Sequence, residues 1–400
     1  MKAQTTIIIS LIVFCGLVCK AQTIENQAPA PFIIKKEALL ANKQRMAAGD
    51  ADILHMMDHL LHDADAALNS GPYSVVFKDK TPPSGDKRDF MSVGPYWWPD
   101  PAKADGLPYV RRDGETNPER HAIKDAEFFK ALVEDVQTLA LAHFYTGERK
   151  YSDKAMDLLK AWFIKDSTKM HPNLKYGQAI PGITEGRGIG LIDTRGIAYL
   201  VDAIQILRLS EGLPVDVYID LRIWCAEFLS WMQTSSIGLD EADEHNNHGT
   251  YYDVQTVALS LFIGKNAEAA RILTTVTTDR ISKQIKPDGS QPHELARTLS
   301  WNYSLMNLTG FFELAAMGDV AGVDLWRFAG AEGQSIRNAF FWMMPYAARE
   351  AEWTFQQIKP FDPSGFVNLA KIAATKFQDD RIRRFLYDED NHDYKFILTH

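Results

Sequence analysis

Apolar residues recur at helical spacing along almost the whole chain, and this period constrains its fold more than any other feature. In residues 125–147 the apolar side chains from Phe128 to Phe144 fall on one stripe, and residues 215–232 show a second one. Further helical patterns occupy residues 34–47, 51–69, 151–165, 195–209, 253–263, 265–283, 292–316 and 365–386. No stretch gives a convincing strand alternation, so the sequence predicts an all-α protein.

Helices that each bury one stripe can pack as hairpins, as a solenoid or as a closed ring. No fixed repeat period is visible, which favours an irregular ring of helical hairpins, an (α/α)n toroid, over a regular repeat array. The chain has 400 residues, and no Gly-, Ser- or Pro-rich linker separates two cores. We therefore expect residues 22–400 to form a single toroid domain with long loops over a cleft.

Residues 1–21 have the pattern of an export signal, with a lysine, a short apolar run and small residues before a cleavage site at Gln22. Cys19 as a lipoprotein anchor is disfavoured, because the bulky Val18 precedes it. The chain is thus expected in the periplasm or outside the cell, with no membrane insertion after cleavage. The mature chain keeps only Cys225, which excludes an intramolecular disulfide.

The formal net charge of -9 argues against a nucleic-acid partner, and an acidic substrate would need a locally basic cleft. Two long segments, 71–120 and 167–194, break the helical pattern, and ordered loops of this length are usually functional. Both carry aromatic and cationic residues. Flat rings suit the apolar faces of sugars, and arginine binds carboxylates through two parallel hydrogen bonds. The candidates from this region are Tyr96, Trp97, Trp98, Arg111, Arg112, Lys175, Arg187 and Arg195.

A dense polar cluster, "DEHNNHGTYY" at residues 243–252, stands at the expected start of an apolar helix. Asn246 or Asn247 is a good N-cap, and capping accounts for one of the two. A helix N-terminus disfavours the imidazolium form, so His245 or His248 there tends to stay neutral and can act as a base. The same backbone amides attract a carboxylate. The cluster therefore suits proton abstraction next to a carboxylate.

A second polar set lies in "PDGSQPHELARTLSWNYSLMNL", residues 287–308. Glu294 is spaced to form a capping box with Gln291 at a helix start. Arg297 and Tyr303 follow, but six residues put them about 120° apart on a straight helix. To serve one site, they need a helix irregularity, or Arg297 must precede the regular part of the helix.

Other chemistries have little support in the sequence. The chain has no Gly-rich phosphate loop, no nucleophile elbow and no helical His-x-x-x-His pair. Asp243, His245 and His248 could hold a metal only in an unusual geometry, so no metal and no cofactor are expected.

Five segments in order, between about residue 70 and about residue 310, resemble the alginate lyase superfamily of polysaccharide lyases. They are "SVGPYWWPDP", "GLPYVRRDGETNPE", "YGQAIPG", "NNHGTYYD" and "DGSQPHELART". The resemblance implies an α/α toroid that cleaves uronic-acid polysaccharides, alginate above all, by β-elimination. An anionic polysaccharide is then the expected partner.

The same resemblance implies four catalytic residues. Asn247 and Arg297 would neutralise the uronate carboxylate, whereas Tyr303 and His248 would move protons. Tyr303 suits elimination with the proton and the leaving oxygen on the same side of the ring, and His248 suits opposite sides. The substrate-binding candidates are Tyr96, Trp97, Trp98, Arg111, Gln178, Arg195, His245, Asn246 and Tyr252.

Three alternatives remain open. Some family members have one residue more between the arginine and the tyrosine, which indicates a separate branch and keeps glucuronan as a candidate substrate. A toroidal glycoside hydrolase would need a pair of carboxylates, for which Asp243 and Glu294 are the nearest candidates. A non-catalytic glycan-binding protein would keep the aromatics and arginines but would not need His248 and Tyr303.

Overall fold

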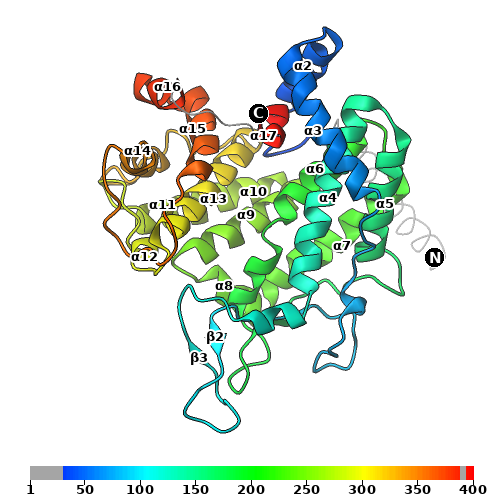
Figure 1. Cartoon of the computed structure of the whole chain (residues 1–400), viewed down its shortest axis with the longest axis vertical. Coiled ribbons are helices and arrows are strands. Elements are labelled where there is room, and N and C mark those ends of the chain that lie inside the picture. The colour runs from blue at the N-terminus through cyan, green and yellow to red at the C-terminus, as the bar shows by residue number, and fades with distance from the viewer. Residues whose placement is uncertain (1–29, 388–392) are drawn as a thin grey trace, which may run out of the picture.

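The computed structural model describes residues 30–387 and 393–400, and nearly all regular structure in them is helical (Figure 1). The predicted signal peptide, residues 1–21, lies outside these ranges. The α-helices are α2 (Lys36–Ala47), α3 (Ala51–Ala67), α4 (Asp125–Thr146), α5 (Arg149–Phe163), α6 (Ile197–Leu209), α7 (Val215–Thr234), α8 (Ser236–Ala242), α9 (Asn247–Phe262), α10 (Asn266–Arg271), α11 (Thr278–Gln284), α12 (Pro292–Leu295), α13 (Ser300–Ala321), α14 (Ile336–Ala347), α15 (Ser364–Phe377), α16 (Asp380–Tyr387) and α17 (Tyr394–Thr399).

The helices form the predicted α/α toroid. Helices α4, α6, α9 and α13 make an inner row in which each packs against the next, while α3 and α5 lie against α4, and α7 and α10 lie against α9. Every residue of α9 from Gly249 to Phe262 is buried, as expected for an inner helix that is covered on all sides. None of the helices among the described residues has the length and apolarity needed to cross a membrane.

Several predicted helices have different bounds in the structure. The patterns at 292–316 and 365–386 are each broken into two helices, α12 with α13 and α15 with α16. The pattern at 265–283 contains a π-helical stretch, η4 (Ile272–Thr277). Helix α9 begins at Asn247, six residues before the predicted start, because the polar residues of its first turn conceal the helical period.

The two long loop segments carry the short strands. Strand β1 (Met91–Val93) pairs in parallel with β4 (Tyr176–Ala179), and β2 (Trp97–Trp98) pairs antiparallel with β3 (Val110–Arg111). The β2–β3 hairpin projects at the bottom of Figure 1. Short 3-10 helices complete the loops: η1 (Val75–Phe77), η2 (Pro118–Ala122) and η3 (Gly188–Thr194).

A tight corner joins α8 to α9 and fixes the start of α9. The side chain of Asn246 accepts a hydrogen bond from the backbone N–H of His248 at 2.9 Å, which confirms Asn246 as the N-cap. Arg280 donates to the carbonyls of Ala242 and Glu244 and to Asp253, all of them within 2.9 Å. The corner is therefore held by one buried guanidinium that satisfies two loop carbonyls and a buried carboxylate.

The corner predicts a strict requirement for glycine at position 249. A Cβ on Gly249 would lie 2.1 Å from the carbonyl oxygen of Glu244 and 2.2 Å from Nη1 of Arg280. Gly249→Ala should therefore lower the free energy of unfolding by about 1–3 kcal/mol, measured by urea denaturation. Gly196→Ala is the matched control, because its Cβ would lie 3.5 Å from Val133, an ordinary contact. Equal stability of the two variants would show that the corner can relax.

Candidate active site

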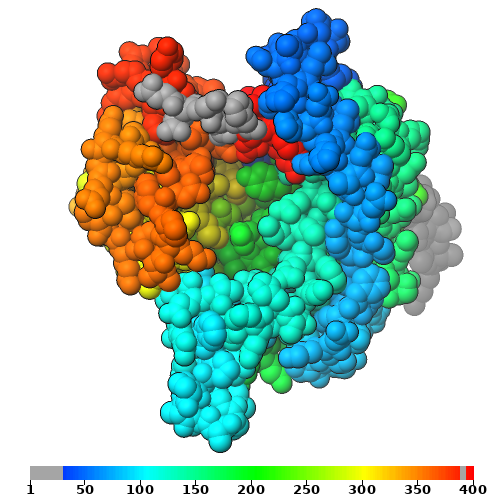
Figure 2. Space-filling view, viewed as in Figure 1, coloured from blue at the N-terminus to red at the C-terminus, as the bar shows by residue number. Residues whose placement is uncertain are grey.

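A cavity of about 890 Å³ opens on the face of the ring shown in Figure 2, at the upper end of the usual range for ligand pockets. It is lined by the loop around β2 and β3, by α4, by η3 and by the starts of α9 and α13. The cavity brings together all four predicted catalytic residues and six of the nine predicted binding residues. Those lining it are Tyr96, Trp97, Arg111, Gln178, Arg195, Asn246, Asn247, His248, Arg297 and Tyr303.

Three predicted binding residues lie elsewhere. Trp98 donates from Nε1 to the carbonyl of Glu115, and Tyr252 is buried with its hydroxyl on the carbonyl of Met232. His245 is exposed in the α8–α9 corner. None of the three lines the cavity, and their predicted contacts with the sugar stay predictions.

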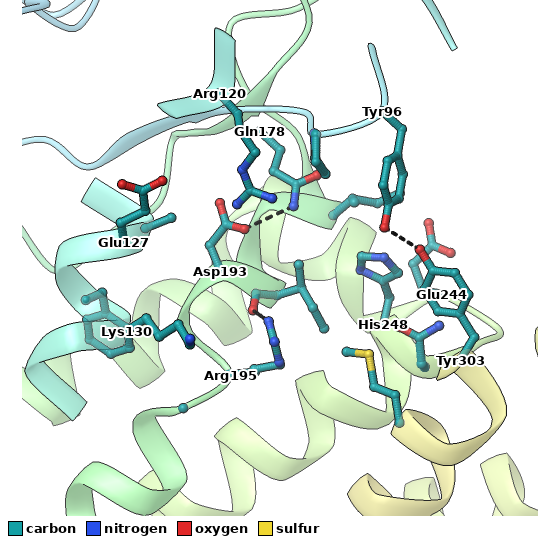
Figure 3. Close-up of a pocket in the computed structure, with 18 of the residues that line it drawn as sticks. Tyr96, Arg120, Glu127, Lys130, Gln178, Asp193, Arg195, Glu244, His248 and Tyr303 are labelled. Atoms are coloured by element: carbon teal, nitrogen blue, oxygen red, sulfur yellow. Dashed lines mark hydrogen bonds between the residues drawn. The ribbon is translucent and has the colours of Figure 1, made fainter. Parts of the chain in front are cut away.

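The cavity is locally basic on an acidic chain. Six cationic side chains line it, against four carboxylates. Of the five loop cations that were candidates for a basic cleft, Arg111, Arg187 and Arg195 line the cavity, whereas Arg112 and Lys175 are exposed outside it. Sequence reasoning missed Arg120 and Lys130, which face the cavity from η2 and α4 (Figure 3). A pocket of this charge suits a polyanion.

Asn247 is held by a buried carboxylate from another helix. Glu294 of α12 accepts the backbone N–H of Asn247 at 2.7 Å and its side-chain Nδ2 at 2.8 Å, and both residues are 1% exposed. Burial raises the pKa of Glu294 more than the two donors lower it. The predicted capping box of Glu294 with Gln291 is wrong, because Glu294 reaches across to α9 instead. This bidentate contact fixes the direction of the Asn247 amide.

A buried carboxylate also contacts His248. Its Nδ1 lies 2.8 Å from Oε1 of Glu241, a residue of α8 that is 1% exposed. The histidine side chain itself is 14% exposed and lines the cavity. Figure 3 shows His248 on the same side of the cavity as Tyr96 and Tyr303.

Arg297 lies in the turn between α12 and α13, before the regular part of α13 begins. This break resolves the 120° separation expected on a straight helix, and it brings the guanidinium carbon within 3.7 Å of the Tyr303 ring centroid. Asp113 accepts Nη2 of Arg297 at 2.7 Å and Nε at 3.1 Å, and it also accepts the backbone N–H of Thr298. Burial raises the pKa of Asp113, but these donors outweigh burial and hold it well below its usual range. Among the described residues, Nη1 of Arg297 has no protein partner and remains available to a ligand.

Tyr303 donates its hydroxyl to the hydroxyl of Tyr96 at 2.7 Å. Burial raises the pKa of Tyr303 far above its usual value, the contact with Tyr96 adds to this, and Arg297 opposes it only in part. The substrate-free protein therefore keeps Tyr303 neutral. Tyr96 comes from the loop that also carries Asp113, so one loop contacts both Arg297 and Tyr303.

Gln178 is fixed at the opposite wall in a left-handed conformation, with φ of 46°. Its side chain donates to Asp193 at 3.1 Å and accepts from Arg187 at 3.2 Å. Such a conformation is costly for a residue other than glycine, and it persists only where the surroundings enforce it. Here it keeps the amide of Gln178 at the cavity surface beside Asp193 (Figure 3).

Sequence reasoning did not identify the carboxylates that contact Asn247, His248 and Arg297. Glu241 and Asp113 carry no distinctive pattern, and Glu294 drew attention only as a cap or as half of a hydrolase pair. Asp243, the other half of that pair, is exposed and outside the cavity. Across the described residues, no group of three or more His, Cys, Asp or Glu side chains is arranged to hold a metal ion.

Comparison with known proteins gives a consistent picture. The family described as alginate lyase matches residues 74–353 of the chain. An alginate lyase from Bacteroides ovatus, solved by crystallography, is similar over 92% of this chain and 98% of its own, with 35% identity and a TM-score of 0.88. A search of curated proteins found no match.

More distant structures share the fold alone. Alginate lyase A1-III from Sphingomonas species A1 covers 94% of this chain and 98% of its own, at 16% identity and a TM-score of 0.58. A variant of alginate lyase A1-III complexed with a tetrasaccharide covers 94% of this chain and 96% of its own, at 15% identity and a TM-score of 0.62.

A buried acid lies beneath the cavity floor. Tyr199, which lines the cavity, donates its hydroxyl to Oε1 of Glu313 on α13 at 2.7 Å. The other oxygen of Glu313 has no hydrogen-bond partner among the described residues. Burial raises the pKa of Glu313 from 4.5 to about 7. The folded protein thus favours the neutral acid up to near neutral pH.

This shift predicts a pH-dependent stability that Glu313→Gln should remove. Because the pKa of Glu313 is higher in the folded protein than in the unfolded chain, protonation of Glu313 stabilises the folded state. This contribution to the free energy of unfolding is complete below about pH 4.5 and is lost as the pH rises to about 7. Glutamine cannot ionise and can still accept from Tyr199. The unfolding free energy of the variant, relative to the wild type, should rise by about 3 kcal/mol between pH 4.5 and pH 8 in urea titrations. The control is Glu185→Gln at an exposed position, and parallel curves for all three proteins would contradict the assignment.

Proposed function

The chain belongs to the alginate lyase family and is a polysaccharide lyase, and we propose that it cleaves alginate or a closely related polyuronate by β-elimination. The products would carry 4,5-unsaturated uronate ends. One observation carries the proposal: Asn247 and Arg297, which can neutralise a carboxylate, line one cavity with Tyr303 and His248, which can move protons.

The first step is neutralisation of the uronate carboxylate. The C5 proton of a uronate is weakly acidic because the neighbouring carboxylate is already negative. Arg297 offers Nη1, and Asn247 offers the second hydrogen of its Nδ2, since Asp113 and Glu294 hold their other donors. Donors fixed in advance stabilise the charge that builds on the carboxylate without reorganising during the reaction. No metal is needed for this step if the two side chains supply the charge and the hydrogen bonds.

The second step is elimination itself. The C5–H bond and the C4–O4 bond break, a C4–C5 double bond forms, and the leaving O4 takes a proton. In mannuronate and glucuronate the C5 proton and O4 lie on the same side of the ring, so one group, Tyr303, can serve as base and then as acid. Tyr303 must first lose its own proton to solvent. The Tyr96 hydroxyl, which accepts a hydrogen bond from Tyr303 at 2.7 Å, can relay that proton if it releases its own to water at the same time.

In guluronate the C5 proton and O4 lie on opposite sides, which requires a base on the other face. His248 supplies one when its Nε2 is unprotonated. Tyr303 then remains the acid that protonates O4. A cavity with both groups can accept more than one uronate, and each positioned proton transfer contributes roughly 10²–10⁴ in rate.

Three alternatives have weaker support. Glucuronan shares the mannuronate geometry at C4 and C5, so it is a second candidate substrate for the Tyr303 route. A glycoside hydrolase built on Asp243 and Glu294 is disfavoured, because one is exposed and the other is buried against Asn247. The basic cavity would also suit a binding protein without activity, but the match to the alginate lyase family disfavours that alternative.

The product assay tests the proposed function. The wild type should raise the ultraviolet absorbance of polymannuronate, polyguluronate or glucuronan solutions as unsaturated ends form. Tyr303→Phe keeps the ring against Arg297 and loses only the hydroxyl, so it should retain polymer binding and lose at least about 10²-fold in turnover. Cleavage without absorbance would identify a hydrolase, and full activity in Tyr303→Phe would exclude Tyr303 from the chemistry.

The kinetics of Arg297→Lys test how the carboxylate is neutralised. Lysine keeps the charge but loses the fork that Asp113 aligns, so kcat should fall by about 10²-fold with a smaller change in KM. Arg120→Lys is the control at the other wall, where salt screens the contact with the polyanion, and it should mainly raise KM, most clearly at low ionic strength, where that contact contributes most. If Arg297→Lys alters only KM, Arg297 is a binding residue and the neutralising group lies elsewhere.

A further inference from the structure

We propose that Glu241 is a positioning residue that holds His248 as the base for guluronate-type, opposite-side elimination and has no part in the Tyr303 route. The inference rests on the proposed function. It assigns a role to a residue that lies outside the cavity and reaches the substrate only through the imidazole ring.

The position of Glu241 is difficult to explain by stability. Its side chain is 1% exposed, and among the described residues the one hydrogen-bond partner of Oε1 is Nδ1 of His248, at 2.8 Å. Oε2 has no hydrogen-bond partner among the described residues. Burying a carboxylate with one partner and one empty oxygen costs several kcal/mol, and a well-packed apolar residue would avoid that cost. The histidine contact is the one specific gain that the described structure offers in return.

The contact selects the tautomer that a base needs. When Glu241 accepts the proton of Nδ1, the lone pair of the neutral ring is on Nε2, the nitrogen left for the cavity. As Nε2 takes the C5 proton, the ring becomes an imidazolium, and the carboxylate beside it stabilises the new charge. Without that acceptor the neutral ring can carry its proton on Nε2 instead. Nε2 then has no free lone pair and cannot take the C5 proton.

The backbone around Glu241 leaves the contact little freedom. Ser235 caps α8 by accepting the N–H of Gly238 at 3.0 Å, and a Cβ on Gly238 would lie 1.9 Å from the carbonyl of Met232. Arg280 holds the carbonyl of Ala242, the residue after Glu241, at 2.6 Å. The corner therefore fixes α8 and α9 relative to each other, and with them Glu241 and His248.

Other charged groups near the pair do not replace Glu241. Asp240 and Glu244 raise the pKa of Glu241, but burial raises it most, and His248 lowers it. Glu294 faces His248 from α12, where it is hydrogen-bonded to Asn247. Tyr303 contacts Tyr96 and Arg297 and has no contact with Glu241, so loss of Glu241 should spare the Tyr303 route.

The test compares Glu241→Gln with two other variants on two polymers. Glu241→Gln should lower kcat on polyguluronate about 10²-fold, with KM nearly unchanged, and should lower kcat on polymannuronate less than about threefold. Asp240→Asn is the matched control, because it removes an adjacent, exposed carboxylate that does not contact His248. It should leave both rates within about twofold of the wild type, a bound set by the small effect of exposed charges.

His248→Ala separates failure of this inference from failure of the proposed function. A selective loss on polyguluronate in His248→Ala, without the same selectivity in Glu241→Gln, would overturn the role of Glu241 alone. Equal losses on both polymers in His248→Ala would overturn the assignment of His248 as the opposite-side base. Equal losses on both polymers in Glu241→Gln would also contradict the inference.

A measurement on the wild type covers the case in which Glu241→Gln does not fold. Nitrogen-15 NMR of histidine-labelled protein reports which ring nitrogen carries the proton, and His248→Ala identifies the His248 signals. The neutral ring should be protonated on Nδ1. Protonation on Nε2 would overturn the inference.

Discussion

Three carboxylates with little or no exposure hold the three cavity groups on which the site depends. Glu294 accepts hydrogen bonds from Asn247, Glu241 contacts His248, and Asp113 accepts hydrogen bonds from Arg297. Charges with so little solvent are tolerated only when they are paired and hydrogen-bonded, so each carboxylate restricts its partner to a narrow range of positions. The site can thus present donors and a base in fixed directions before any substrate arrives.

The irregular parts of the toroid bring these pairs together. The α8–α9 corner, held by Arg280, places Glu241 beside the first turn of α9, which carries both Asn247 and His248. The break between α12 and α13 releases Arg297 from the helical period and lets it stack on Tyr303. The inner helices form the wall of the site, and the breaks between helices carry the proposed catalytic residues Asn247, His248 and Arg297.

Much of this architecture could be predicted from the sequence, because helical periodicity and the polar cluster at 243–252 are local patterns. The catalytic candidates follow from the same clusters together with the family resemblance. The carboxylates that hold these candidates could not be predicted from the sequence. Asp113 lies 184 residues from Arg297, and Glu241 looks like a surface acid until α8 is folded against α9. Tyr252 lies outside the cavity, since a tyrosine in a polar cluster can still point into the core.

We infer that Asn247 and Arg297, which would neutralise the substrate carboxylate, are already in place in the substrate-free protein and do not move when the substrate binds. A crystal structure of the Tyr303→Phe variant with a uronate tetrasaccharide tests it most directly. We predict one sugar carboxylate within hydrogen-bond distance of Asn247 and Arg297, with the contacts to Glu294 and Asp113 retained. A carboxylate bound instead by Arg120 and Lys130, or an Arg297 that leaves Asp113 to reach the sugar, would contradict it.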